Sequence, residues 1–173
     1  MAVTKLATVT PSSTNLAVFT SIPGTYDDLM IIGSAKSSYT STTAFSTYRM
    51  SMRMNNDSAN NYSWGLWGVD GSSLQVQNEA TWDSTYVYAN ASSHSSNVGW
   101  GHFSIYIPGY KISTAYKAFQ MVGGYSTTAS NQSGWTGRGQ WLSNSAITEI
   151  DINSSFGNYV AGTTMTLYGI SNS

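Results

Sequence analysis

Short runs in which apolar and polar residues alternate recur along the chain, separated by clusters of Gly, Asn and Ser. The clearest run is residues 47–54. Its two faces are Tyr48, Met50, Met52 and Met54 on one side and Thr47, Arg49, Ser51 and Arg53 on the other. Because a period of two sends alternate side chains to opposite faces of a β-strand, this run predicts a strand with its Met face buried. Asn55, Asn56 and Asp57 then predict a turn.

The same alternation predicts further strands, three with a regular period and six less regular. The regular runs are residues 102–107, 148–153 and 165–168; the others are 16–22, 28–35, 74–78, 81–89, 116–125 and 140–142. Residues 29–32 are continuously apolar, which predicts a strand covered on both faces. Every long window contains Gly, a Ser/Thr cluster or a β-branched run, so no helix of three turns is expected. About nine or ten short strands between turns indicate one all-β domain, a β-sandwich.

The ends of the candidate domain are less regular. Residues 1–15 finish in Pro11-Ser12-Ser13-Thr14-Asn15 and are expected to form an N-terminal arm that orders against a neighbour. The sandwich is then assigned to residues 16–173. The polar stretch 126–134 is interpreted as an exposed loop.

The composition of the chain argues against several classes of function. Charged residues are 9% of the chain, far below the ~25% of an average domain, and the net charge is −1. The seven basic residues are scattered, so nucleic-acid binding is not expected. Absence of Cys removes disulfides and thiolate sites. There is no apolar stretch for a membrane helix and no signal-peptide pattern at the start, so neither a membrane nor secretion is expected.

Several pieces of the sequence, taken in order, resemble a family of small domains in tailed-phage virion proteins, particularly appendage and decoration proteins. The pieces are Tyr26-Asp27-Asp28-Leu29, Met52-Arg53-Met54-Asn55-Asn56-Asp57, Asn61-Tyr62-Ser63, Ile107-Pro108-Gly109-Tyr110, Tyr116-Lys117, the run 141–150, Phe156, Thr163 and Leu167-Tyr168-Gly169-Ile170. They cover roughly residues 20 to 170. The resemblance implies a β-sandwich of jelly-roll type in a virion, and it carries over no binding residue.

The resemblance leads to two functional expectations. The first is a non-enzymatic capsid decoration (cement) protein on the exterior of the phage head, made in the host cytoplasm and bound to capsid or other virion proteins. An arm suits docking onto a shell, and the domain is expected to stand alone without a fibre shaft; a homotrimer is expected by resemblance. The alternative is a receptor-binding tail-fibre or tail-tip module that grips a host-surface glycan.

The six tryptophans are the candidates for a ligand site. Trp64, Trp67 and Trp82 lie in Gly-rich or polar surroundings and are interpreted in two ways. Their faces could stack on sugars along a glycan-binding edge. Otherwise they fill the core or a subunit interface, where Trp is also enriched, and this second interpretation is preferred.

No catalytic, cofactor or metal residues are expected. Glu79 and Asp83 are the best carboxylate pair for glycoside hydrolysis, yet an i,i+4 pair in a strand is separated by roughly 13 Å. His94 and His102 have no nucleophile motif beside them. The oxygen-rich segments 55–58 and 70–72 lack the spacing of a calcium loop and are interpreted as turns.

Overall fold

The computed structural model describes residues 1–40, 49–71, 73–92, 99–128 and 131–172. These residues form thirteen strands and no helix, so this part of the chain has no helix that could cross a membrane. The strands are β1 (Ala2–Val9), β2 (Leu16–Phe19), β3 (Asp28–Ser37), β4 (Arg49–Met54), β5 (Tyr62–Asp70), β6 (Ser73–Trp82), β7 (Thr85–Tyr88), β8 (Asn90–Ser92), β9 (Gly101–Pro108), β10 (Lys117–Thr128), β11 (Asn131–Trp141), β12 (Ile150–Ser154) and β13 (Thr164–Ser171).

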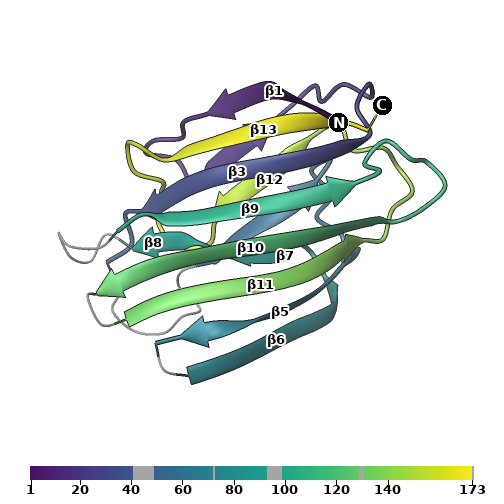
Figure 1. Ribbon diagram of the computed structural model, residues 1–173. Helices are drawn as coiled ribbons and strands as arrows, with labels where there is room; N and C mark the ends of the chain where they lie inside the picture. The colour runs from purple at the N-terminus through teal and green to yellow at the C-terminus, as the bar shows by residue number, and fades with distance from the viewer. Residues whose placement is uncertain (41–48, 72, 93–98, 129–130, 173) are drawn as a thin grey trace.

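The strands form two sheets packed face to face, which confirms the expected β-sandwich. The large sheet has the order β1-β13-β3-β9-β10-β11-β5-β6, with β8 joined to β3, and the small sheet has the order β2-β12-β4-β7. Figure 1 shows the large sheet in front, from β1 at the top to β6 at the bottom, with β12 and β7 of the small sheet behind it.

Eight of the strands have the order of a jelly roll. They form two four-stranded layers, β1-β13-β3-β9 and β2-β12-β4-β7, and the chain passes back and forth between the layers. Two hairpins, β5–β6 and β10–β11, are inserted between jelly-roll strands, and both extend the large sheet beyond β9. The large sheet is therefore wider than the sheet that covers it.

The core lies between the two sheets and follows the predicted alternation. Met50, Met52 and Met54 are fully buried, while Arg49 and Arg53 on the other face of β4 are half-buried. The assignment of the Met face to the core is confirmed for these three residues; Thr47 and Tyr48 of the predicted strand lie outside the described residues. Aromatic side chains from the inserted hairpins, including Trp135 and Trp141, enlarge this core.

The expectation that residues 29–32 are covered on both faces is wrong. Leu29 and Ile31 are fully buried, but Ile32 is 45% exposed. The reason is the two-layer architecture, in which the large sheet has a partner on one face only. A continuous apolar run in β3 therefore places Ile32 on an uncovered outer face.

Residues within the expected arm form a strand of the jelly roll. β1 pairs antiparallel with β13 from Ala2↔Ser171 to Val9↔Met165, and Leu6, Ala7 and Val9 pack against the core. Both chain ends consequently lie at the same end of the sheet (Figure 1). The boundary at residue 15 stays a prediction, but β1 is held by its own chain.

The interpretation of residues 126–134 as an exposed loop is also wrong. Residues up to 128 continue β10 and residues from 131 begin β11, with Ser126 opposite Gln132 and a buried Ser133 opposite Tyr125. Polar side chains at the end of a long hairpin do not prevent pairing, because the backbone supplies the hydrogen bonds.

The turn predicted after β4 is confirmed. Asn55 and Asn56 both have φ of 52°, and the Asp57 amide donates to the Met54 carbonyl at 3.0 Å, as in a type I′ turn. Asp57 then accepts hydrogen bonds from Ala59 N, Asn61 Nδ2 and Trp141 Nε1 at 2.8–2.9 Å. These bonds hold the pKa of Asp57 below its usual value even though burial raises it.

Candidate functional site

A large hollow lies on the outer face of the large sheet, the face that the small sheet does not cover. It has a volume of about 670 Å³, within the usual range for ligand pockets of roughly 300–1,000 Å³. Five adjacent strands contribute to it. Its lining is Ser63, Trp64 and Gly65 of β5, Asn78, Glu79 and Ala80 of β6, Tyr106 and Pro108 of β9, Ala118, Phe119 and Gln120 of β10, and Arg138, Gly139 and Gln140 of β11. We call this hollow the outer groove.

The strand register explains why the sheet is hollow here. One row of outer side chains runs Asn78–Gly65–Arg138–Gln120–Tyr106, and the next row contains Ser63–Gln140–Ala118. Gly65 and Ala118 leave space between the longer side chains of their rows. A Cβ placed on Gly65 would meet only Asn78 Cβ, at 4.0 Å. The space above Gly65 is therefore open and is not filled by a neighbour.

Four polar side chains on the face of the outer groove are not bonded to the protein. Among the described residues, none makes a side-chain hydrogen bond or ion pair with Asn78, Gln120, Arg138 or Gln140. All of them are at least partly exposed. They comprise three amides and one guanidinium, so the groove offers both donors and acceptors and one positive charge.

Tyr106 forms a fixed aromatic surface at the β9 side of the groove. Its hydroxyl donates to Asp28 Oδ2 at 2.7 Å, and this bond raises the pKa of Tyr106. Burial raises the pKa of Asp28, but hydrogen bonds from Tyr106, from Gly109 N at 2.9 Å and from Asn172 Nδ2 at 3.1 Å outweigh burial and lower it overall. Asp28 is thus ionised and holds the phenol ring in place.

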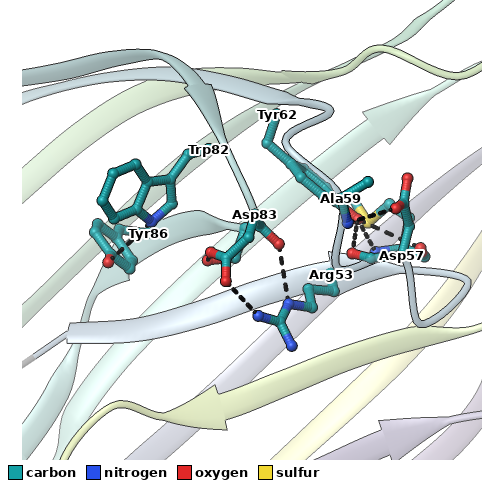
Figure 2. Close-up of polar contacts among 9 residues, drawn as sticks. Arg53, Asp57, Ala59, Tyr62, Trp82, Asp83 and Tyr86 are labelled. Carbon is teal, nitrogen blue, oxygen red and sulfur yellow. Dashed lines mark hydrogen bonds and ion pairs between the residues drawn. The ribbon is translucent and has the colours of Figure 1, made fainter.

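A second hollow, of about 500 Å³, opens at the sheet edge between β6 and β7. Trp82 Nε1 donates to the Tyr86 hydroxyl at 3.2 Å, and the guanidinium carbon of Arg49 lies 4.3 Å from the centre of the Tyr86 ring. The rings of Trp64 and Tyr86 lie 5.0 Å apart. Figure 2 shows Trp82 beside Tyr86, with Asp83 next to them bound to Arg53. We call this hollow the edge cleft.

The aromatic groups of the edge cleft are mostly engaged with one another. Trp64 Nε1 and Arg49 Nε are buried and have no hydrogen-bond partner among the described residues. Because both atoms are shielded from solvent, a ligand in the cleft could not bond them without a movement of the side chains. Leaving such a group unpaired costs about 1–3 kcal/mol, so these two atoms detract from stability.

A third feature is an apolar surface on the outer face of the β5–β6 hairpin. Trp67 is 49% exposed, Val69 45%, Leu74 76% and Val76 72%. The register places Trp67 opposite Val76 and Val69 opposite Leu74, so the four side chains are contiguous. We call them the apolar strip. It lies along β6, whose outer backbone edge has no partner strand among the described residues.

The three tryptophans singled out from the sequence do not form one site. Trp64 is only 7% exposed and points into the sandwich, whereas Trp82 is 39% exposed, and both line the edge cleft. Trp67 lies on the opposite face of β5, in the apolar strip. The outer groove has no signature in the sequence, because single Gln, Asn and Arg residues on separate strands form no local motif.

The other sequence candidates also lie apart. Asp83 forms an ion pair with Arg53 at 2.7 Å, whereas Glu79 lies opposite Trp64 at the edge cleft and has no ion pair among the described residues, so the two carboxylates have different environments. His102 is exposed on β9, and His94 lies outside the described residues. In the part of the chain that the structure describes, no group of three metal-ligating side chains occurs. In segment 70–72, which was interpreted as a turn, Gly71 lies in a turn and has φ of 60°. Ser72 is outside the described residues.

Comparison of the chain with protein-family models gives no match, and comparison with curated proteins gives none either.

Proposed function

We propose that this chain is a non-catalytic structural protein of a tailed-phage particle, and specifically a decoration (cement) protein on the exterior of the head. Its partners would be capsid or other virion proteins, and its oligomeric state a homotrimer. The ordered resemblance along residues 20 to 170 supports the virion assignment. A low content of charged residues, 9%, is consistent with a protein whose surface is largely covered in an assembly.

The observation that carries the proposal is the apolar strip beside an open sheet edge. Natural proteins usually protect a long edge strand with Lys, Pro or a covering segment, because an unpaired edge binds other strands. β6 has ten residues, no Lys and no Pro, and its apolar side chains Leu74 and Val76 are more than 70% exposed. Contiguous exposed apolar surface of this kind marks protein–protein contacts. We therefore assign the β5–β6 hairpin to the contact with the shell.

The test uses particles that lack this protein, to which purified chain is added back. Wild-type chain should bind the heads and raise the temperature at which they release DNA. Val76→Ser should reduce both effects, because it removes apolar contact area at the centre of the strip. Ile112→Ser is the matched control, since Ile112 is 46% exposed in the loop between β9 and β10 and lies outside the strip.

Two results would overturn the proposal. One is that heads lacking the protein are as stable as complete heads and do not bind the added chain. The other is that Val76→Ser and Ile112→Ser bind equally well to wild type, which would remove the hairpin from the contact.

A second candidate is a receptor-binding module of the tail that grips a host-surface glycan. The outer groove favours it, because four unbonded polar side chains surround an open hollow. In that case particles lacking the protein would keep full head stability and lose adsorption to host cells.

A further inference from the structure

We infer that the outer groove binds a neutral oligosaccharide. The inference does not depend on the decoration role, and it gives the receptor-binding candidate a defined site. It rests on the shape of the groove, on its hydrogen-bonding groups and on its charge.

The shape suits an extended ligand with a flat face. The groove crosses five strands, and adjacent strands are about 4.8 Å apart, so it spans roughly 19 Å. Its floor is formed by small residues such as Gly65 and Ala118, while Tyr106 presents an aromatic ring at one side. Aromatic rings pack against the C–H faces of sugars, and the bond from Tyr106 to Asp28 keeps this ring in one orientation.

The hydrogen-bonding groups of the outer groove suit a ligand rich in hydroxyl groups better than a ligand that can only accept hydrogen bonds. Each sugar hydroxyl both donates and accepts, and the amides of Asn78, Gln120 and Gln140 do the same. Arg138 can donate to two neighbouring oxygens, and the amide oxygens can accept from hydroxyls. Because none of these four side chains is bonded to a described residue, a ligand would not have to break protein hydrogen bonds.

The charge of the groove argues against a polyanionic ligand. Among the lining residues, Arg138 is the one charged side chain that the register places on this face, whereas a polyuronate carries a carboxylate on every sugar. One cation pairs with only one carboxylate, so the others would lose water without gaining a partner. The sugar class is therefore assigned as neutral.

Gly65 allows a variant that fills the groove without disturbing the fold. Its φ is not in the left-handed region, and a Cβ there would have no contact closer than 4.0 Å. Gly65→Leu should therefore fold normally and occupy the space above the floor. Gly134→Leu is the matched control, because Gly134 is on the same exposed face, outside the groove, with no heavy atom within 4 Å of its Cβ position.

The experiment is titration of the purified full chain by calorimetry with cellohexaose, maltohexaose and chitohexaose, and with hexagalacturonate as the anionic probe. We expect saturable binding of at least one neutral hexasaccharide. Affinity should fall by at least about tenfold in Gly65→Leu, equivalent to about 1.4 kcal/mol, and stay within twofold in Gly134→Leu. Thermal melting checks that both variants are folded.

Three results would overturn the inference. They are absence of binding to all three neutral hexasaccharides, binding of hexagalacturonate alone, and unchanged binding in folded Gly65→Leu. If Gly65→Leu instead loses binding to heads and no glycan binds, the groove holds a segment of a shell protein. The two proposals can fail separately, because Val76→Ser tests the head contact and Gly65→Leu tests the groove.

Discussion

Replacing Gly137 with Ala tests how closely β11 is packed against β5. A Cβ at this position would lie 2.2 Å from Leu66 Cδ2, 2.5 Å from the Gly65 carbonyl oxygen and 3.1 Å from Leu66 Cα. Two of these atoms belong to the backbone, so a change of rotamer cannot relieve the overlap and the two strands must separate locally. Overpacking of this kind costs about 1–3 kcal/mol. For a domain of this size, the melting temperature should fall by about 2–12 °C.

Gly134→Ala is the control on the same strand. It lies on the exposed outer face, where nothing is within 4 Å of a new Cβ and φ is ordinary for any residue. Alanine there should stabilise the protein by about 0.4–1 kcal/mol, because it reduces the conformational entropy of the unfolded chain. Urea unfolding and thermal melting followed by circular dichroism measure both variants. If Gly137→Ala is as stable as wild type, or if both variants shift alike, the inner and outer faces of β11 are assigned incorrectly.

Two further predictions concern buried positions. Met52→Asp should prevent cooperative folding, because an unpaired buried carboxylate costs several kcal/mol and the whole free energy of unfolding is about 5–15 kcal/mol. The control Ser51→Asp, on the other face of β4, should still unfold cooperatively in urea. Asp151 is buried, and burial followed by the nearby charge of Glu149 raises its pKa, so the folded protein binds this proton more tightly than the unfolded chain does. Asp151→Asn should therefore melt at a higher temperature than wild type at pH 7, and the difference should disappear as the pH falls below 3.8; equal melting at pH 7 would contradict the assigned environment.

Much of the fold was predictable because several of its strands have one buried face and one more exposed face. The period of two in β4, β9 and β13 assigns their buried residues correctly, since each strand alternates between the core and a wetter surface. Ile32 shows where the argument fails. An apolar residue on the outer face of β3 cannot be told from a core residue by pattern alone.

Of the inserted strands, β6 and β10 were predicted in part, from runs 74–78 and 116–125, whereas β5 and most of β11 were not. In β11 the reason is that glycine replaces the usual apolar residues. In β11 the inner positions are Ser133, Trp135, Gly137, Gly139 and Trp141, so the alternation is interrupted where neighbouring side chains fill the space. A Cβ on Gly139, for example, would lie 2.3 Å from the Phe119 ring. In β5, Tyr62, Trp64 and Leu66 alternate with more exposed residues, and this signal could have identified the strand.

The candidate site was not predictable from local sequence. The outer groove combines side chains from five strands, and their neighbourhood depends on the pairing of β5 with β11 and of β10 with β9. The sequence pointed to Trp64, Trp67 and Trp82. Trp64 and Trp82 line the edge cleft and are largely occupied by contacts within the protein, and Trp67 belongs to the apolar strip. The groove exists because the strand register places Arg138 beside Gly65 and Gln120 beside Arg138.

The role of the N-terminal segment also changes with the structure. β1 is an edge strand that covers β13 and contributes Leu6 and Val9 to the margin of the core. Removing residues 1–15 would therefore expose a new sheet edge on β13, in addition to any effect on docking. For this reason the β5–β6 hairpin, and not the N-terminal segment, is the better place to test the shell contact.

Imaging of the phage particle by electron cryomicroscopy tests the central proposal most directly. We predict density for this β-sandwich on the outside of the head, at every equivalent position of the shell lattice, with the β5–β6 hairpin toward the shell. Density confined to the tail tip or fibres, on particles with a bare head surface, would contradict the decoration role and favour the receptor-binding alternative.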